Sequence, residues 1–232
     1  MKNLNKVLIA ISLLTLSTSL YSQRMTVKGG LNLSKIGFTT NDPYLNEFFN
    51  DNIKPSTGFN LGITSEFKIA KPLAIETGLI FSTKGFMMTE MEETYKMKVK
   101  LNLYYIDVPL NLKVSQNIGK VKVYGTAGPY IGIGLLASLK MEETYSGETH
   151  TDREFIVIED LGFKHLDYGV NAGIGVEIKA IQIGVNYGYG LQNLVLASSA
   201  DGKITNKVLS CTVGYKFGKK KKPTKPTEAL PK

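Results

Sequence analysis

Cysteine and long apolar runs are nearly absent from this sequence of 232 residues. Cys211 is the only cysteine, so the chain forms no internal disulfide bond, and no cysteine follows the early apolar run where a lipoprotein anchor would be attached. No later segment approaches the roughly 18 consecutive apolar residues that indicate a membrane helix. The mean hydropathy of -0.05 would class the chain as soluble, but barrel strands escape that test because half of their residues face inward.

The first 22 residues have the three parts of a secretory signal peptide. Lys2 and Lys6 come first, the apolar run Val7–Leu16 follows, and the small polar stretch Ser17–Ser22 precedes the expected cleavage site. We therefore predict that residues 1–22 direct export and are removed.

Positive charge is concentrated at the C-terminal end. The net charge is +8, and Gly218–Lys232 contains six lysines and one glutamate, whereas the region before it is nearly balanced. We interpret residues 218–232 as a disordered Lys/Pro-rich tail in the periplasm. Because the excess charge is confined to this tail, nucleic-acid binding is not expected.

The segment Leu166–Leu191 alternates strictly between apolar residues and polar residues or glycine. Period two is the pattern of β-strands, and Lys179-Ala180 interrupts it as a two-residue turn. Each strand has about the 9–11 residues that cross a bilayer at a tilt. One face is apolar and the other is too poor in bulky side chains to form a soluble core, so we interpret the segment as a transmembrane β-hairpin. An aromatic girdle is expected at Tyr168, Tyr187 and Tyr189.

The same alternation predicts six further strands, joined by alternating long and short connections. The strands are Met25–Ile36, Thr57–Ile69, Leu73–Ser82, Leu101–Val114, Val121–Ala137 and Lys207–Phe217. Long polar loops are expected at Gly37–Ser56, Thr83–Lys100, Ser138–Phe163 and Gln192–Asn206. Pro109 cannot donate a ladder hydrogen bond, so we expect a β-bulge there. Residues 23–217 are thus predicted to form an all-β, eight-stranded antiparallel up-and-down transmembrane barrel with short periplasmic turns and long external loops.

Five motifs carry a family resemblance. They are the Ser-Gln end of the signal, Lys28–Asn32, Tyr105–Leu110, Gly128–Tyr130 with its glycine-rich continuation, and the hairpin Gly173–Tyr189. Together they resemble the PorT-like outer-membrane β-barrels of Bacteroidetes over Val27 to Phe217. The resemblance implies a barrel in the cell outer membrane. One family member is implicated in type IX secretion, a role that does not transfer by resemblance.

The inward faces of the predicted strands carry a nearly balanced set of charges. They are Lys28, Lys68, Lys113, Lys122, Lys179 and Lys216, with Glu66, Glu76, Asp107, Asp167 and Glu177. One interpretation is a charged constriction or anion path. The favoured one is a plug of paired ions, because eight strands enclose barely enough room for side chains and unpaired buried charges are costly.

A catalytic interpretation depends on His165 and Asp167, which are predicted to share the inward face near the external mouth. Such a pair can serve as a base and its orienting carboxylate in a rim hydrolase. No serine or second acid is marked out as a partner, so a hydrogen-bonded rim histidine is favoured, and His150 is too isolated to interpret. We predict no catalytic, cofactor-binding or metal-binding residues, no cofactor and no enzymatic activity.

Two other sequence patterns give only weak indications of a binding site. The string Met91–Tyr95 recurs as Met141–Tyr145, and these acidic loops are either a shared cation or partner site or, as favoured, a solvated surface. Gly132-x-Gly134-x-x-Ala137 mimics a dinucleotide-binding fingerprint without the βαβ unit that it needs. We interpret these small residues as making room for Tyr124 and Tyr130.

The sequence therefore predicts an integral outer-membrane barrel that is an anchor or binding module. We expect a monomer in outer-membrane lipid whose external loops and periplasmic tail meet a ligand or a periplasmic or cell-surface protein. The alternatives are a small barrel hydrolase and a soluble lipocalin-like periplasmic barrel, which would place its apolar residues inside. A passive pore is not expected at eight strands.

Overall fold

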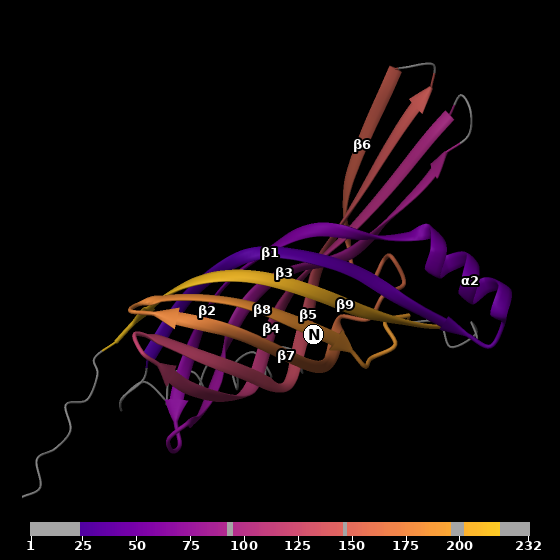
Figure 1. The fold of residues 1–232 in the computed structure, drawn as a ribbon. Helices are drawn as coiled ribbons and strands as arrows, with labels where there is room; N and C mark the ends of the chain where they lie inside the picture. Colours follow the sequence, from indigo (N-terminus) through magenta and orange to yellow (C-terminus); the bar gives the residue numbers. More distant parts are fainter. Residues whose placement is uncertain (1–23, 92–94, 146–147, 196–201, 219–232) are drawn as a thin grey trace, which may run out of the picture.

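The structure is a computed structural model that describes residues 24–91, 95–145, 148–195 and 202–218 (Figure 1). The predicted signal peptide at residues 1–22 lies outside the described residues. So does the predicted tail at 218–232, apart from its first residue.

Nine strands and one helix make up the described part of the chain. The strands are β1 Arg24–Thr40, β2 Ile53–Lys68, β3 Leu73–Met91, β4 Tyr95–Ile118, β5 Val121–Tyr145, β6 Glu148–Val157, β7 Leu166–Ile178, β8 Ile181–Gly190 and β9 Gly202–Phe217, and the helix is α2 Pro43–Asn52.

Eight of these strands form a closed antiparallel barrel. From β1 to β5 and from β7 to β9 each strand pairs with the next, β5 pairs with β7, and β9 pairs with β1 to close the sheet. Strand β6 pairs with β5 alone and stays outside the barrel. The predicted all-β up-and-down barrel is confirmed, with a ninth strand added to it. The predicted turn at Lys179-Ala180 is also present, with Ile178 opposite Ile181.

The strict alternation of the sequence sorts the side chains between two surfaces of the barrel wall. Leu31 and Ile174 point outward and are 72% and 71% exposed, whereas Glu66 and Asp167 point inward and are 3% and 0% exposed. This polarity is the reverse of a soluble protein, in which apolar side chains gather inside. The lipocalin-like alternative required an apolar interior, and the structure has a polar one.

The two ends of the barrel differ in their connections. The turn end carries the short turns after β2, β4 and β7 together with the described chain ends, and the loop end carries the longer connections and α2 (Figure 1). Aromatic side chains are exposed near both ends. The tyrosines predicted as a girdle, Tyr168, Tyr187 and Tyr189, are 44%, 46% and 39% exposed, and Tyr215 and Phe217 lie toward the turn end of β9.

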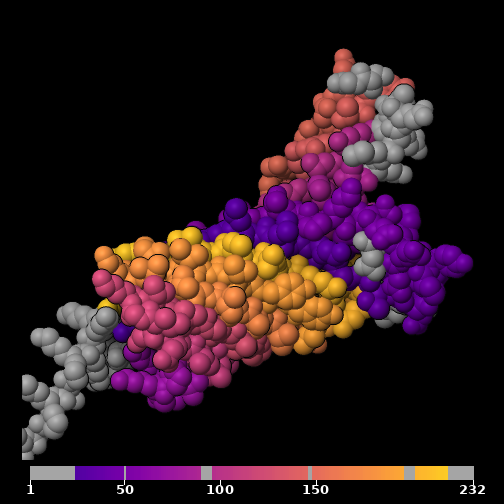
Figure 2. Space-filling model, in the orientation of Figure 1, coloured from indigo at the N-terminus to yellow at the C-terminus, as the bar shows by residue number. Residues whose placement is uncertain are grey.

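Two of the four predicted long loops are strands instead. Residues predicted as loops at Thr83–Lys100 and Ser138–Phe163 continue β3, β4 and β5 beyond the barrel wall and form β6. We call the resulting four-stranded sheet the extension; it comprises Phe86–Met91, Tyr95–Leu101, Leu136–Tyr145 and β6. Figures 1 and 2 show it projecting from the barrel. The loop prediction was wrong because polar residues on an exposed sheet look like loop residues in the sequence.

The first predicted loop, Gly37–Ser56, contains the end of β1, helix α2 and the start of β2. Asp42 begins the helix, because its side chain accepts hydrogen bonds from the backbone N–H groups of Tyr44 and Leu45, and Pro43 occupies the first turn. In the described residues no helix is long and apolar enough to cross a membrane.

The expected bulge at Pro109 is also wrong. The β4–β5 register is the same on both sides of Pro109 and shifts instead between Tyr104 and Tyr105. At this level the barrel wall passes into the extension, and a bulge bends a strand locally.

An apolar cap closes the barrel at the loop end. Leu103, Tyr105 and Ala137 of the wall pack with Ile158 of the β6–β7 connection, and Phe86, Leu139, Leu161 and Phe163 pack around them. The first four are completely buried. The cap therefore fixes the base of the extension to the barrel and covers the charged interior below it.

Candidate functional site in the barrel interior

Seven charged side chains, one from each of seven strands, meet inside the turn end of the barrel. They are Lys28, Glu66, Glu76, Lys113, Lys122, Glu177 and Lys216, which we call the turn-end cluster. Each comes from an inward position of the alternating pattern, so barrel closure alone brings them together. Four ammonium groups meet three carboxylates there, and each carboxylate contacts at least two lysines.

Lys113 is the centre of this cluster. Its Nζ lies 3.1 Å from a Glu66 oxygen, 3.2 Å from a Glu76 oxygen and 2.9 Å from a Glu177 oxygen. The same nitrogen lies 4.2 Å from the ring centroid of Tyr124, a distance that suits a cation–π contact. The residue is fully buried, so its charge is compensated by the protein and not by solvent.

The outer lysines complete the network around Lys113. Lys216 Nζ lies 2.9 Å from Glu66 and 2.6 Å from Glu177, and Lys28 Nζ lies 3.1 Å from Glu76. Lys122 reaches a Glu177 oxygen at 3.4 Å. The network therefore ties opposite walls of the barrel together across its axis.

A second buried ionic group lies closer to the loop end. Lys84 Nζ is 2.8 Å from Asp107 and 3.0 Å from Asp167, and it lies over the rings of Tyr105 and Tyr130. Asp167 also accepts hydrogen bonds from the side chains of Tyr130 and Asn206. We call this group the Lys84 cluster; it places one cation between two carboxylates directly below the apolar cap.

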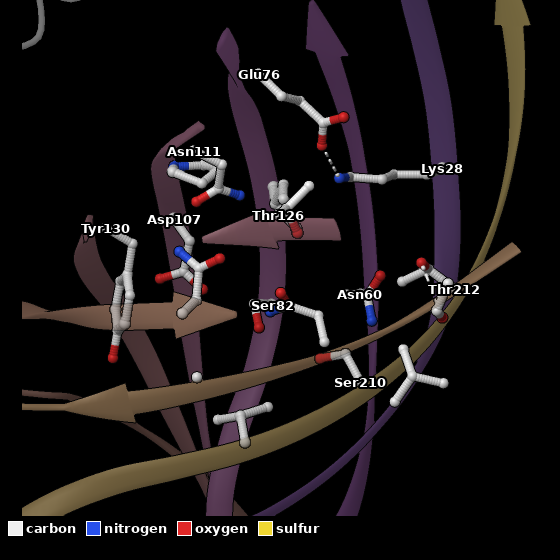
Figure 3. A pocket seen from close by; sticks show the side chains of 18 of the residues that line it. Lys28, Asn60, Glu76, Ser82, Asp107, Asn111, Thr126, Tyr130, Ser210 and Thr212 are labelled. Carbon is white, nitrogen blue, oxygen red and sulfur yellow. Dashed lines mark hydrogen bonds and ion pairs between the residues drawn. The ribbon is translucent and has the colours of Figure 1, made fainter. Parts of the chain in front are cut away.

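A cavity of about 110 Å³ lies between the two clusters. Its lining combines neutral hydrogen-bonding side chains, among them Asn60, Ser82 and Ser210, with apolar side chains such as Ile80 and Val208. Lys28 and Glu76 lie at one boundary and Asp107 and Tyr130 at the other (Figure 3).

Charged and apolar layers occupy the barrel interior. The turn-end cluster, the cavity, the Lys84 cluster and the apolar cap follow one another from the turn end to the loop end. The mutual pairing of the ions agrees with the favoured interpretation of a plug of paired charges. Among the described residues, no group of three or more histidine, cysteine or acidic side chains could hold a metal ion.

Most of the inward charges predicted from the sequence are in this interior, and two are not. Lys68 and Lys179 are exposed at the turn end, where strands give way to turns and the inward–outward alternation stops. Lys84 was missed because it fell in a segment predicted to be a loop. The alternation could have identified it, because Glu76, Ser82 and Lys84 are separated by even numbers of residues. All three therefore lie on the same face of β3.

The structure separates His165 from Asp167. The His165 ring contacts the Gly134 carbonyl oxygen at 3.0 Å and a Glu159 carboxylate oxygen at 3.3 Å, whereas Asp167 contacts Lys84 and Asn206. Strand β7 begins at Leu166, so His165 precedes the strand. The alternation that turns Asp167 inward therefore does not apply to His165. This agrees with the favoured interpretation of a hydrogen-bonded rim histidine.

The remaining sequence patterns have structural explanations where they are described. Lys98 and Lys140 contact Glu142 of the second acidic string, and residues 92–94 of the first lie outside the described residues. Gly132 makes room for the Lys84 cluster, since a Cβ there would lie 2.4 Å from an Asp107 oxygen. Tyr124 is instead accommodated by Gly175 and Gly184, and Tyr130 by Gly169.

The sequence profile of the outer membrane protein β-barrel domain matches residues 22–196. The chain belongs to this family. Membership of the outer membrane protein β-barrel domain family points to the outer membrane as its location. No match was found among curated protein sequences.

The structure also matches several solved outer-membrane barrels at low sequence identity. Ail of Yersinia pestis, solved with a heparin analogue, is 15% identical with a TM-score of 0.38, and the match covers 85% of this chain and 100% of Ail. Neisserial surface protein A is 15% identical with a TM-score of 0.38, covering 83% and 97%. OprG of Pseudomonas aeruginosa is 12% identical with a TM-score of 0.39, covering 84% and 96%. The family assignment rests on the sequence match and not on these structures.

Proposed function

We propose that this protein is a non-enzymatic outer-membrane anchor that displays the extension and α2 as binding surfaces outside the cell. The filled interior carries the proposal: two ionic clusters and an apolar cap occupy the barrel axis, while a four-stranded sheet and a helix project at the loop end. A ligand or partner protein can reach elements that project from a filled barrel, but it cannot enter the filled interior.

The proposed orientation places the turn end in the periplasm. Barrels of this kind have short periplasmic turns and longer external loops, and the turns after β2, β4 and β7 are short. The Lys/Pro-rich segment 218–232 then lies in the periplasm, where it can meet a periplasmic protein or an anionic surface. We propose a monomeric barrel in outer-membrane lipid that binds no nucleic acid, exported by the signal peptide at residues 1–22.

Helix α2 is the best candidate for contact with a ligand or a cell-surface protein. Tyr44, Leu45 and Phe48 are 84%, 45% and 56% exposed on it. Exposed aromatic side chains are typical of contact surfaces, and the neighbouring leucine adds to the apolar area. Within the family, the motifs in Lys28–Asn32 and Tyr105–Leu110 support a place among the PorT-like barrels of Bacteroidetes.

Membrane fractionation combined with surface cleavage tests this function. We expect the full-length protein in the outer-membrane fraction, with electrophoretic mobility that changes on boiling. A protease site inserted at residues 146–147 should be cut on intact cells, whereas the same site inserted at Gly119-Lys120 should be cut only after the outer membrane is opened. Recovery in the soluble periplasm, or the reverse cleavage pattern, contradicts the proposal.

Conductance of the purified barrel in planar bilayers provides an independent check. The filled interior predicts no steady single-channel current. A stable open channel would show that the ionic clusters do not obstruct the axis, and the anchor function would be rejected in favour of a pore.

A further inference from the structure

The outward face of the extension continues the lipid-facing surface of the barrel. On β4, Leu110 and Leu112 face outward. Every second residue of the strand lies on the same face, and these residues include Lys100, Lys98 and Lys96. The pairing of β3 with β4 keeps one register from the pair Phe81 and Ile106 to the pair Met91 and Lys96. The face that meets lipid within the barrel therefore becomes the outward face of the extension.

One apolar cross-strand row on this face is followed by a mixed row and then by a row of cations. Tyr104, Leu136 and Val157 form the apolar row, and in the next row Phe155 lies beside the polar residues Asn102 and Ser138. Val157 and Phe155 of β6 are 46% and 61% exposed. The following row consists of Lys100, Lys140 and Arg153. An apolar band bordered by basic residues is the pattern of a protein surface at the boundary between acyl chains and headgroups.

Charge of opposite sign is segregated to the other face of the extension. The outward face carries Lys96, Lys98, Lys100, Lys140 and Arg153 with one described carboxylate, Glu142. The opposite face carries Glu143, Glu148, Asp152 and Glu154. A solvated surface that served only solubility would have no reason to separate its charges in this way.

The cations of this face outnumber its described carboxylates. Glu142 pairs with Lys98 at 3.3 Å and with Lys140, but among the described residues neither Lys100 nor Arg153 forms an ion pair. Lys100 Nζ donates a hydrogen bond to the Thr57 carbonyl oxygen. Partial burial, together with the neighbouring cations Lys98, Lys140 and Arg153, lowers the pKa of Lys100, which lies beyond the barrel wall. An external anion would relieve this repulsion.

The extension does not continue along the barrel axis. Figure 1 shows it leaning away from that axis, and Figure 2 shows the same in outline. The apolar cap holds the base of the extension, so the lean is maintained by buried contacts.

We infer that the outward face of the extension binds the phosphate groups of anionic lipids in the outer leaflet of the membrane. Lys100, Lys140 and Arg153 meet the phosphates at the headgroup level, where Phe155 and Val157 lie beside them. Basic side chains of this kind are attracted to anionic headgroups, and Arg binds phosphate through paired N–H donors. The inference rests on the outer-membrane location proposed above.

An environment-sensitive fluorophore on the outward face tests the inference. The label is attached at Thr151→Cys in a Cys211→Ser background, and the full-length mature protein is folded into vesicles of phosphatidylcholine alone or with phosphatidylglycerol. We expect the emission to shift to shorter wavelength as the anionic lipid increases. The variant Lys100→Gln/Lys140→Gln/Arg153→Gln should need roughly 100-fold more anionic lipid for the same shift, since each cation near an anionic surface contributes about fivefold.

A matched control removes three cations from β1 and β9, which lie across the barrel from β4 and β5. Lys35→Gln/Lys203→Gln/Lys207→Gln changes the net charge equally and should keep the parental response. If the two triple variants respond alike, or if Lys100→Gln/Lys140→Gln/Arg153→Gln responds like the parent, the inference is rejected. Reversal of the shift by millimolar inorganic phosphate would assign the face to soluble phosphates and would also overturn the lipid assignment.

Failure of the inference is separable from failure of the proposed function. Mobility that changes on boiling shows that each variant has folded and inserted. A protein that inserts but gives no anionic-lipid response contradicts only the lipid site, whereas a protein that inserts into neither vesicle contradicts the membrane location.

Discussion

Replacing Lys84 with methionine tests whether the Lys84 cluster stabilises the barrel. The Lys84 and Asp167 side chains are 3% and 0% exposed, and that of Asp107 is 15% exposed, so the variant leaves two buried carboxylates without their cation. Methionine retains most of the side-chain volume, and the effect of the charge is thereby isolated from the effect of a cavity.

The structure sets the size of the expected loss. At N–O distances of 2.8 and 3.0 Å, each ion pair contributes about 6 kcal/mol of attraction at an effective dielectric constant of about 20, before desolvation is subtracted. Removing one partner of a buried pair costs about 3–5 kcal/mol in practice. We expect Lys84→Met to lower the free energy of unfolding by that amount.

Neutralising the carboxylates should restore most of the stability. Lys84→Met/Asp107→Asn/Asp167→Asn removes all three charges, and buried ion pairs can be replaced by neutral groups at little cost. Lys68→Met, at an exposed lysine, should change stability by less than about 0.5 kcal/mol. Urea unfolding of the barrel in lipid vesicles measures these differences. Equal stability of Lys84→Met and the parent would refute the reasoning, as would a triple variant no more stable than the single one.

Two pairs of substitutions test the close approach of strands and the lipid-facing surface. Gly128→Ala places a Cβ 2.1 Å from the Leu110 carbonyl oxygen and should cost about 1–3 kcal/mol, whereas Gly125→Ala, whose nearest atom is 3.9 Å away, should cost less than about 0.5 kcal/mol in the same urea assay. Ile174→Lys, at a residue that is 71% exposed on the barrel wall, should lower stability in lipid vesicles by about 2–4 kcal/mol, and Ile69→Lys in the turn-end connection by about 0–1 kcal/mol. Equal effects within either pair would contradict the assigned packing or the assigned membrane face.

The barrel could be predicted from the sequence because lipid enforces a simple rule on each strand. In Leu166–Leu191 every second residue must be apolar, while the narrow interior requires small or polar residues, so the period is visible without any long-range information. The register followed from the two-residue turn. The ion pairs followed from the same parity, since inward residues of opposite charge have few other partners in a closed barrel.

The extension could not be predicted because the alternation of apolar and polar residues holds only for strands that face lipid. Around Lys96–Leu101 the outward residues are basic instead of apolar, so the alternation is between two kinds of exposed residue and resembles a loop. Lys84 was missed for the same reason. The packing of Ile158 into the cap also depends on contacts between segments that are distant in the sequence. The alternation within single strands gives no information about such contacts.

Strand β6 has a consequence for how the protein avoids self-association. Closing a sheet into a barrel leaves no unpaired edge, but β6 pairs with β5 alone and restores an open row of backbone donors and acceptors. Its sequence places Glu148, Asp152, Arg153 and Glu154 along that row. Charged side chains disfavour the docking of a second strand. The edge of β6 can thus remain unpaired without recruiting other copies into a continuous sheet.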